Sequence, residues 1–499
     1  MPRRLAELAV CAPDRPFLTE VGGPTLTYGQ TWELVRRWAG WLADLGIERG
    51  DRVVSALRSS IDAHALWLAC GCVGAWEVAV NPDLRGELLE NVLQDAGARY
   101  CFTRAEDAER FTAAGRGITT IVVDRERPRA AGYEPAPIGA FPAPEDVACV
   151  IFTSGSSGMP KGVMITWGQM SASVGRIPRS WLSEADVAYS FHSMAHVTGR
   201  TPLPSMCDVT GRVVLRERFS ASAFWDDVRS HGCTTTTVVA PLLLAQPERP
   251  DDADNPLRVV FGGHPLGQAR RFAERFDVAV LANYGSTEAG FPMSNRWPLE
   301  SPSPRAGWLR RGYQAKIVDE SGLEVPEGTA GELWVKPPAR ALMARGYLNS
   351  EERTRRAFVG DWYRTGDVLV RHPDGGFEFV DRMGDTVRRL GENISLTALE
   401  HVVGQAGSVA ECVACGVEDD LVGTALLVVV VPSGGRELDP AALYAQLADR
   451  LPKYMHPTYI AQVSELPRAA NSHKPRRSEL KVAELISGAW QAPQPARGS

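Results

Sequence analysis

Two periodicities of apolar residues alternate along the first part of the chain. Between Thr27 and Leu45 the apolar residues recur at helical spacing, and Gly46 follows as a helix C-cap. Short apolar and β-branched runs between helical segments predict buried strands. The predicted strands are 52–57, 75–80, 99–103 and 118–123. Helices are predicted at 62–73 and from Pro82 onward, and residues 1–20 predict a short amphipathic helix followed by a turn. This alternation predicts a mostly parallel sheet flanked by helices.

The middle of the chain continues this pattern, and polar loops follow its strands. Val147–Phe152 is predicted to be a buried strand, and a helix is predicted to start at Trp167 after an intervening loop. Further strands are predicted at 234–240, 257–261 and 278–281. Ligands of parallel sheets bind beyond the carboxyl ends of the strands. We therefore expect the loops that follow Phe152, Phe261 and Leu281 to converge on one ligand.

The rest of the chain predicts a small β subdomain and then a second domain. Strands at 314–319 and 331–335 and a hairpin with its tip at 373–376 form the subdomain. The second domain is predicted to contain helices at 398–403 and 440–451 and strands at 411–417 and 425–431. The predicted boundaries are 1–381 for the N-terminal domain, 382–385 for a hinge, 386–488 for the C-terminal domain and 489–499 for a flexible tail. The predicted fold class is α/β: a large N-terminal domain of helix-flanked sheets plus a β subdomain, with a small mobile α+β C-terminal domain.

Composition narrows the class of protein. Of 499 residues 44% are apolar, and the formal net charge is −6 with a pI near 5.9; the scattered basic residues argue against a nucleic-acid surface. No apolar run of about 18 residues predicts a membrane span, and the N-terminus lacks the apolar core of a signal peptide. The nine cysteines form no disulfide framework, and the Cys70/Cys72 and Cys412/Cys415 pairs lie in apolar segments, which favours core packing over zinc or redox chemistry. We expect a soluble, cytoplasmic protein.

The loop after the strand at 147–152 has the chemistry of a phosphate-binding loop. Its glycines, hydroxyl residues and single cation are Gly155, Gly158, Gly162, Thr153, Ser154, Ser156, Ser157 and Lys161. Glycines let backbone N–H groups turn inward and the hydroxyls add donors, so the loop can hold a polyphosphate. The alternative is a plain Gly/Ser surface loop, but the preceding strand, the following helix and the lysine favour phosphate. It is not a Walker loop, because Gly162 follows Lys161 where Ser or Thr is required.

Polar residues further along the chain complement a phosphate site. Glu288 can hold Mg²⁺ against the phosphates, Thr287 can donate to them, and Tyr284 offers a face to adenine. Asp367 as an acceptor and Arg382 as a donor suit ribose hydroxyls. Each residue taken alone is equally consistent with a solvated surface position. Their order along the chain favours the functional interpretation.

A segment with two histidines suits the wall of a pocket. Residues 188–204 combine aromatic side chains, a glycine, His192 and His196. For either histidine the alternative is a core residue whose hydrogen bonds are satisfied. We prefer that alternative for His192 and leave both interpretations open for His196.

The loop at 147–166 closely resembles the phosphate loop of the AMP-forming adenylating enzymes, which include acyl-CoA synthetases, luciferases and the adenylation domains of peptide synthetases. The resemblance extends from about residue 25 to residue 481. Residues 284–288 resemble the Thr-Glu motif of that superfamily, and residues 363–367 resemble its ribose-binding motif. Residues 381–382 and 388–395 resemble the hinge and the adjoining loop of its acyl-CoA ligases. Residues 310–315 and 344–349 are most similar to a carnitine-CoA-ligase-like branch.

The resemblance implies a reaction in two half-reactions with ATP/AMP, Mg²⁺ and coenzyme A as cofactors. An acid and ATP give acyl-AMP and pyrophosphate; the small domain then rotates about its hinge, and the thiol of coenzyme A displaces AMP. Gly384 stands at the pivot, where the superfamily usually has Lys or Asp, and His196 stands beside the acyl carboxylate. The resemblance adds Gly263, His264, Asn283 and Gly285 to the nucleotide site, and it places Gly391, Glu392 and Asn393 on the coenzyme A side.

The sequence departs from the superfamily at the lysine that serves adenylation. Lys474 comes one residue late after Leu466-Pro467, and His473 stands in place of a glycine. One extended residue adds about 3.3–3.6 Å of chain, and a misplacement of about 1 Å can lower a rate roughly 10²-fold. A loop and the long lysine stem can absorb this shift, so Lys474 can still be the catalytic lysine.

Four functions are consistent with these observations. The first is an acyl-CoA ligase for a hydrophobic carboxylic acid. The second is a ligase that only converts a preformed acyl-AMP to the thioester, and the third is a non-catalytic nucleotide or acyl-adenylate binder. The fourth, a domain that loads a carrier protein, is weakened because the chain contains no carrier segment. Expected partners are the acid or its adenylate and coenzyme A, with a separate adenylating enzyme or a second copy of the chain as further candidates; no nucleic acid or membrane span is expected.

Overall fold

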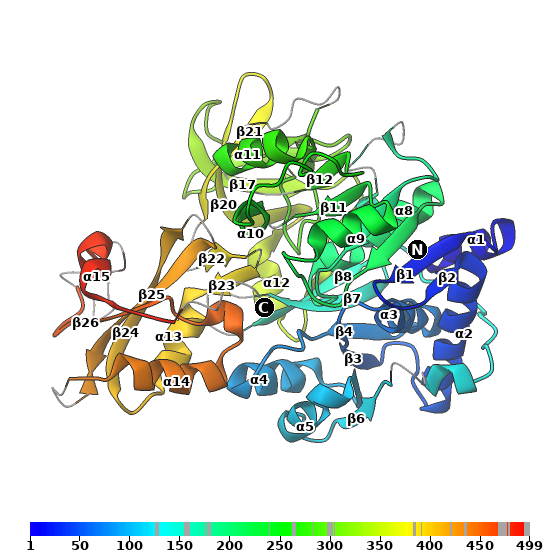
Figure 1. Ribbon diagram of the computed structural model, residues 1–499, viewed down its shortest axis with the longest axis horizontal. Helices are drawn as coiled ribbons and strands as arrows, with labels where there is room; N and C mark the ends of the chain where they lie inside the picture. Colours follow the sequence, from blue (N-terminus) through cyan, green and yellow to red (C-terminus); the bar gives the residue numbers. More distant parts are fainter. Residues whose placement is uncertain are drawn as a thin grey trace. The chain divides into compact units, whose positions relative to one another are not determined.

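Figure 1 shows a computed structural model of the chain. It describes residues 1–124, 129–153, 160–174, 177, 181–238, 240–261, 266–281, 283–296, 303, 305–382, 386–390, 392–419, 422–433, 437–467, 477 and 480–493. The chain forms two compact units. The first comprises residues 1–82, 92–152 and 162–383, and the second comprises 83–91, 153–161 and 384–499. Among the described helices, none is both long and apolar enough to cross a membrane.

The first sheet is mostly parallel and has the strand order β18-β8-β7-β4-β3-β5-β6. Its strands are β3 (Arg52–Ala56), β4 (Trp76–Ala79), β5 (Tyr100–Thr103), β6 (Thr119–Val122), β7 (Val147–Thr153), β8 (Lys161–Thr166) and β18 (Gly346–Tyr347). The pairs β3–β4, β3–β5, β4–β7 and β5–β6 are parallel, and β18 runs antiparallel to β8. Most residues of β3, β4, β5 and β7 are buried. Such continuous burial is typical of a parallel sheet that is covered on both faces.

The second sheet has the order β13-β12-β11-β9-β10-β1-β2 and is parallel except for β2. Its strands are β1 (Pro16–Glu20), β2 (Thr25–Thr27), β9 (Val187–Ser190), β10 (Arg212–Leu215), β11 (Thr235–Thr237), β12 (Val259–Phe261) and β13 (Ala279–Leu281). Thr237, Phe261 and Leu281 are in register across β11, β12 and β13. The loops that follow these three strands therefore leave from the same edge of the sheet.

Helices cover these two sheets. They are α1 (Pro2–Cys11), α2 (Tyr28–Asp44), α3 (Ile61–Val73), α5 (Ala105–Ala114), α6 (Trp167–Ala172), α7 (Val197–Arg200), α8 (Pro202–Val209), α9 (Phe224–His231), α10 (Ala240–Leu244) and α11 (Leu266–Phe276), with α4 (Gly86–Ala96) extending from the second unit into the first. α2 begins with a capping box in which Thr27 and Gln30 satisfy each other's backbone N–H groups. α3 contacts β3 and β4 of one sheet and β1 of the other, and it is buried almost along its whole length. It is apolar on all sides because both sheets pack against it.

A third sheet forms the β subdomain, and its strand pairs are antiparallel. Its order is β14-β15-β21-β20-β17-β16, with β19 beside β20. The strands are β14 (Met293–Ser294), β15 (Gly307–Leu309), β16 (Gln314–Val318), β17 (Ala330–Lys336), β19 (Phe358–Val359), β20 (Trp362–Arg371) and β21 (Gly376–Arg382), and α12 (Glu351–Ala357) precedes β19. Met293, Leu333, Leu369 and Phe377 form its apolar core together with Tyr284.

The second unit has a hairpin followed by a mixed sheet and helices. Its elements are β22 (Thr386–Arg389), β23 (Glu392–Ser395), α13 (Leu396–Gly404), β24 (Val409–Asp419), β25 (Gly423–Pro432), α14 (Pro440–Arg450), β26 (Tyr459–Gln462), α15 (Val482–Gly488) and β27 (Trp490–Gln491). β22 and β23 pair with each other, and the four-stranded sheet has the order β24-β25-β26-β27. Leu427 and Val429 of β25 are fully buried in its core.

The α/β class predicted from the sequence is confirmed, but several elements differ from the prediction. Lys161–Thr166 is the strand β8 and not part of the loop, because Val163 and Ile165 alternate into the core of the first sheet. The phosphate loop therefore connects two strands, and α6 begins six residues after Lys161. A further consequence is that the loop after β7 belongs to a different sheet from the loops after Phe261 and Leu281.

Smaller differences occur elsewhere. The turn predicted near the N-terminus is β1, whose Phe17 and Leu18 are fully buried. The strand predicted at 234–240 ends at Thr237, and the helix predicted from Pro82 begins at Gly86. Trp490 and Gln491 lie in the predicted tail but pair with β26 as β27. All nine cysteines are described, and none of them forms a disulfide there.

Candidate active site

Glu288 is held in a buried position by a tyrosine from a distant part of the chain. Its side chain is 5% exposed, and Oε1 accepts a hydrogen bond of 2.8 Å from the hydroxyl of Tyr347. Tyr347 lies on β18, opposite Val163 of β8, and Ala344 donates its backbone N–H to the carbonyl of Glu288. Burial and the charge of Glu288 raise the pKa of Tyr347, so this hydroxyl stays protonated and remains a donor. The geometry keeps the carboxyl group of Glu288 in place beside the edge of the first sheet.

The backbone that precedes Glu288 forms a tight turn. Ser286 and Gly290 exchange backbone hydrogen bonds, and the side-chain amide of Gln169 on α6 donates to the carbonyl of Thr287 at 2.8 Å. A Cβ atom at Gly285 would lie 2.4 Å from the carbonyl oxygen of Gly290, so only glycine fits there. The turn therefore orients Thr287 and Glu288 with respect to α6.

Asp367 is positioned by two hydroxyl groups. Its carboxylate, on β20, accepts a hydrogen bond of 2.6 Å from the hydroxyl of Tyr284, and its backbone N–H donates to Oγ1 of Thr365. Asp367 is 5% exposed, and Tyr284 is 8% exposed. Tyr284 thus has a structural role that the sequence did not indicate, because its phenol anchors the carboxylate that was expected to bind ribose. Its predicted contact with adenine stays a prediction.

The side-chain amide of Asn283 has no hydrogen-bond partner among the residues that the structure describes. Both polar atoms of its amide are buried, and neither has a hydrogen-bond partner in the described part of the chain. A buried polar group without a partner lowers stability by about 1–3 kcal/mol. Asn283 comes two residues after the carboxyl end of β13, the edge where ligands of parallel sheets bind. A ligand that both donates and accepts hydrogen bonds can satisfy this amide.

His196 begins α7 and caps it. Its Nδ1 accepts a hydrogen bond from the backbone N–H of Thr198 at 3.2 Å, and it lies 2.5 Å from Oγ1 of the same residue. Accepting through Nδ1 places the proton of the neutral ring on Nε2. His192 stacks against Phe191 with the ring centroids 4.4 Å apart. The predicted position of His196 beside an acyl carboxylate stays a prediction.

A buried ion pair fixes the segment that carries His196. Arg200, the last residue of α7, contacts Glu77 of β4 at 2.6 Å, and both side chains are completely buried. Nε of Arg200 donates to the carbonyl of Met194 at 2.8 Å, and its guanidinium lies 4.8 Å from the ring centroid of Trp67. Burial raises the pKa of Glu77, and Arg200 opposes this shift. This pair joins the segment 192–200 to the first sheet.

The described residues near the phosphate loop are its two ends. Thr153 ends β7 and Lys161 begins β8. Oγ1 of Thr153 is buried, and no described residue forms a hydrogen bond with it. Ser154, Gly155, Ser156, Ser157 and Gly158 lie outside the described residues, as do Gly263, His264, Gly384, Gly391 and Lys474. The side chains of Arg382 and Asn393 also lie outside the description, so the predicted roles of all these residues stay predictions.

In the second unit the described residue of the predicted coenzyme A side is Glu392. It pairs with Arg389 across the β22–β23 hairpin, and burial raises the pKa of its carboxyl group. Leu390, in the hairpin turn, has a φ of 51°, which is unusual for a residue with a branched side chain. Arg389 donates to the carbonyl of His456 at 2.5 Å and so ties the hairpin to the segment after α14.

Four residues that position the site were not identified from the sequence. Each of them contacts a residue between 32 and 123 positions away in the sequence. The four residues, with their partners, are Tyr347 with Glu288, Gln169 with Thr287, Thr365 with Leu333, and Glu77 with Arg200. Tyr347 lies in the 344–349 motif, whose resemblance to the carnitine-CoA-ligase-like branch does not indicate a contact with Glu288. Such long-range partners leave no local pattern in a single sequence.

Glu288 is the candidate ligand for a metal ion. No group of three or more His, Cys, Asp or Glu side chains placed to hold a metal occurs among the described residues. Mg²⁺ is commonly held by one or two carboxylates together with phosphates of the substrate. The buried, fixed carboxylate of Glu288 fits that type of shared site.

Comparisons with known proteins agree with this geometry. The family model for the AMP-binding enzyme matches residues 5–348, and the model for the AMP-binding enzyme C-terminal domain matches residues 398–473. The chain is 32% identical over 468 residues to the medium/long-chain-fatty-acid–CoA ligase FadD17 of Mycobacterium marinum, covering 86% of this chain and 89% of that protein. It is 28% identical over 472 residues to the crotonobetaine/carnitine–CoA ligase of Salmonella paratyphi A, and the match covers 89% of this chain and 90% of that protein.

Solved structures show the same fold. A binary complex of the o-succinylbenzoate CoA synthetase (MenE) of Bacillus subtilis has a TM-score of 0.85, with 24% identity and 99% of both chains covered. The amide bond synthetase McbA of Marinactinospora thermotolerans has a TM-score of 0.84 and 24% identity, and the match covers 97% of this chain and 99% of that chain.

The fold, the buried Glu288 and Asp367 and the two family matches define the class of protein: the chain belongs to the AMP-binding enzyme family. Relatives that it matches over nearly their whole length are named as acyl-CoA ligases. Within the family this protein is an enzyme of that type, an acid–thiol ligase.

Proposed function

We propose that this enzyme joins a hydrophobic carboxylic acid to coenzyme A through an acyl-AMP intermediate. In the first half-reaction a carboxylate oxygen of the acid attacks the α-phosphorus of ATP, and pyrophosphate leaves. In the second the thiolate of coenzyme A attacks the acyl carbon, and AMP leaves with the bonding electrons. The observation that carries the proposal is the buried Asn283 amide, which has no hydrogen-bond partner among the described residues and is next in sequence to Tyr284, which anchors Asp367.

The proposed nucleotide site combines Asn283, which follows β13, with Asp367, which lies within β20. The amide of Asn283 can donate to and accept from the edge of a base, and the carboxylate of Asp367 can accept from ribose hydroxyls. Thr153 and Lys161 border the phosphate loop and would contact the phosphates; the buried hydroxyl of Thr153 has no partner among the described residues. Because Tyr284 holds Asp367 through a hydrogen bond of 2.6 Å, this acceptor is oriented before the ligand binds.

Charge is the main obstacle to the first half-reaction, because a carboxylate must approach a polyphosphate. Positive groups must lie where the negative charge accumulates. Mg²⁺ bound by Glu288 and the phosphates would supply part of that charge, and Lys161 and Lys474 would supply the rest. Glu288, held by Tyr347, sets where the cation binds. His196 is proposed to lie beside the carboxylate of the acid.

A narrow cavity supports a hydrophobic acid. It lies between α8 and the second sheet and has a volume of about 30 Å³. Apolar side chains such as Leu182, Met206 and Phe261 line it together with hydroxyl residues and Asp208. This space holds a water-sized group, so a longer acyl chain must displace a side chain, and Met206 is the most adaptable one there. Thr235 also lines the cavity, and its buried hydroxyl has no partner among the described residues.

The second half-reaction is proposed to need the smaller unit. Rotation about a hinge at 382–385, with Gly384 at the pivot, would exchange Lys474 for the hairpin that contains Gly391. The backbone around Gly391 would then line the path of the pantetheine. Support for this step comes from the family match at 398–473 and from the resemblance of residues 388–395 to the coenzyme A loop of acyl-CoA ligases.

One observation favours a second candidate, a ligase limited to the thioester step. Lys474 comes one residue later than in the superfamily pattern, and His473 replaces a glycine. The non-catalytic binder is not proposed, because the chain belongs to a family of enzymes.

Two assays on the purified protein test the proposal. Release of pyrophosphate that depends on a fatty acid measures the first step, and consumption of supplied acyl-AMP that depends on coenzyme A measures the second. Both activities are expected. Thioester formation without pyrophosphate release would establish the second candidate, and the absence of both activities with short, medium and long acids would refute both proposals.

The variant Lys474→Ala separates the two steps. If the full ligase operates, this substitution abolishes pyrophosphate release and spares the conversion of acyl-AMP to the thioester. Replacing Gly391 by a bulky residue is expected to do the reverse. Loss of the thioester step in Lys474→Ala would argue against alternation between two arrangements of the smaller unit.

A further inference from the structure

The first unit contains a large groove apart from the residues assigned to nucleotide and acid. Its volume of about 670 Å³ lies within the range of about 300–1,000 Å³ that is usual for small-molecule sites. Its lining includes Pro142, Trp167, Ser171, Arg310, Arg311 and Leu342. Neither the described residues of the active site nor those of the narrow cavity contribute to it.

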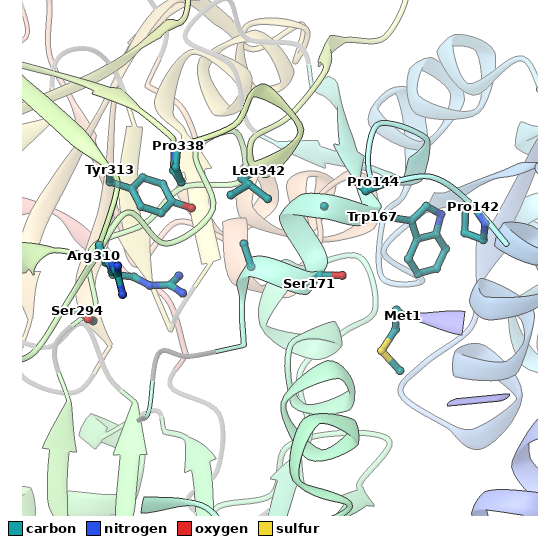
Figure 2. A pocket seen from close by; sticks show the side chains of 13 residues that line it. Met1, Pro142, Pro144, Trp167, Ser171, Ser294, Arg310, Tyr313, Pro338 and Leu342 are labelled. Carbon is teal, nitrogen blue, oxygen red and sulfur yellow. The ribbon is translucent and has the colours of Figure 1, made fainter. Parts of the chain in front are cut away.

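The two ends of this groove differ in character. Figure 2 shows Arg310, Ser294 and Tyr313 together at one end. It shows Pro142, Pro144 and Trp167 at the other end, with Leu342 and Ser171 between the two groups. One end therefore presents a guanidinium and hydroxyl groups, while the other end consists mainly of proline and tryptophan rings and also includes Met1.

The polar end of the groove carries the positive charge of Arg310 and Arg311. Arg310 and Arg311 lie in the turn between β15 and β16, and none of the described residues that line the groove is acidic. The guanidinium of Arg310 donates to the carbonyls of Phe291 and Val174 at 3.0 and 2.9 Å and lies 5.9 Å from the ring centroid of Tyr313. These contacts hold the cation in place but do not neutralise it. Arg311 is exposed and can move toward a bound anion.

The apolar end is built before any ligand arrives. The ring of Trp167 is buried and stacks on Trp67 with the centroids 5.2 Å apart and an interplanar angle of 12°. The floor is the start of α6, where Gly168 donates to the carbonyl of Pro144 at 2.8 Å. A Cβ atom at Gly168 would lie 2.4 Å from the carbonyl oxygen of Ala341, so the backbones on the two sides of the groove approach each other there. A preformed apolar wall binds an alkyl chain without a large loss of conformational entropy.

From this charge distribution we propose that the groove is a second binding site, for a fatty carboxylate. The carboxylate binds to Arg310 and Arg311, and the alkyl chain lies along Leu342 toward Trp167 and Pro142. Charge complementarity selects the anionic head, and the apolar wall selects the chain. The site does not depend on the proposed reaction, because its residues take no part in it.

Calorimetric titration of the full chain with dodecanoate tests the site. The active site is first saturated with a non-hydrolysable acyl-sulfamoyl adenosine, whose binding is measured separately and reports on the proposed function alone. One equivalent of dodecanoate is expected to bind the saturated protein, and dodecanol is expected to bind at least about tenfold more weakly because it lacks the charge. Equal affinity for dodecanol, or binding of dodecanoyl-CoA but not of dodecanoate, would overturn the proposal.

Two pairs of variants localise the binding. Ser171 is exposed in the middle of the groove, and Ser171→Glu adds a negative charge while Ser171→Gln adds the same bulk without charge. Dodecanoate is expected to bind Ser171→Glu at least about tenfold more weakly than Ser171→Gln. Arg311→Gln is expected to weaken binding about tenfold, and Arg355→Gln, an exposed arginine on α12, is expected to leave it unchanged. Identical affinities within each pair would place the bound dodecanoate elsewhere and refute the site.

Discussion

The hydroxyl of Tyr347 lies 2.8 Å from Oε1 of Glu288 and connects β18 to the turn that follows β13. The two residues are 59 positions apart, and both are buried. A hydrogen bond to a charged group contributes about 1.5–3 kcal/mol. The orientation of the Glu288 carboxylate, and with it the proposed Mg²⁺ position, therefore depends on Tyr347.

The substitution Tyr347→Phe tests this dependence. It removes one hydroxyl and retains the ring, so kcat/KM for pyrophosphate release is expected to fall by about tenfold to a hundredfold, and the Mg²⁺ concentration needed for half-maximal rate is expected to rise. Tyr100→Phe on β5 is the matched control, because its hydroxyl donates to a backbone carbonyl, that of Leu45, away from the site. Equal rates for the two variants would show that Glu288 does not need Tyr347.

Replacement of Asn283 by leucine is expected to separate stability from ligand binding. Leucine has a similar shape and removes two buried polar atoms that have no hydrogen-bond partner in the described part of the chain. The free energy of unfolding is therefore expected to stay the same or to rise by about 1 kcal/mol, while AMP binds at least about tenfold more weakly. Denaturant unfolding and equilibrium titration with AMP measure these two quantities. A variant that is less stable but binds AMP normally would show that the amide serves the fold.

The Glu77–Arg200 pair is expected to show strong energetic coupling. Glu77→Gln leaves the completely buried Arg200 without a counter-ion, and such a change lowers the free energy of unfolding by about 3–5 kcal/mol. The double variant with Glu77→Leu and Arg200→Met is expected to lose much less unfolding free energy than the sum of the losses in the single variants Glu77→Leu and Arg200→Met. Equilibrium denaturation of the four proteins in this cycle measures the coupling, and additive losses would contradict it.

The variant Glu77→Gln also tests whether the Glu77–Arg200 pair positions the segment that contains His196. Because Arg200 ends α7, a disturbed ion pair is expected to raise the KM for the acid more than the KM for ATP. A general loss of folded protein would lower the apparent rate with both substrates equally, so the ratio of the two KM values distinguishes the effects.

His64 is expected to make the enzyme sensitive to acid. Burial, together with the positive charge of Arg200, lowers its pKa to about 4, while the unfolded chain has the usual value near 6.5. Above pH 6.5 the ring is neutral in both states and has no effect on stability. As the pH falls from 6.5 toward 4 only the unfolded chain takes up the proton, so stability is lost by up to about 3 kcal/mol.

The variant His64→Gln tests this sign. It does not titrate in this range, so its loss of stability between pH 6.5 and 4 should be smaller than that of the wild type by about that amount. His231→Gln, at the end of α9, is a control with a more accessible histidine. Parallel pH profiles for all three proteins would contradict the assignment.

Thr235 is expected to influence which acids are accepted. Its buried hydroxyl lines the narrow cavity and lacks a partner among the described residues. Thr235→Val keeps the shape and removes the hydroxyl, so kcat/KM for an alkanoic acid is expected to rise relative to that for a hydroxyalkanoic acid by about tenfold. Competition between decanoate and hydroxydecanoates measures this ratio, and an unchanged ratio would place the acyl chain elsewhere.

Much of the architecture follows from local pattern. The helix at Tyr28–Asp44, the strands of the first sheet and the β20–β21 hairpin were predictable because each carries its own period, cap or turn residues. β8 was not, because a Gly-containing stretch next to a Gly/Ser loop has the composition of loop, and only pairing with its neighbours in the sheet makes it a strand. β1 was missed for the same reason: its five residues are stabilised by pairing with β10, almost 200 positions away.

The sequence alone identified the superfamily and the residues that carry its motifs, because phosphate loops and acidic positions after strands are local features with a chemical cause. Only the tertiary structure showed which groups orient them. Tyr347, Gln169 and the buried Glu77–Arg200 pair reach the site through contacts between distant segments. It also revealed the groove with Arg310 and Trp167 at opposite ends, because a cavity arises from the packing of separate segments and leaves no pattern in any one of them.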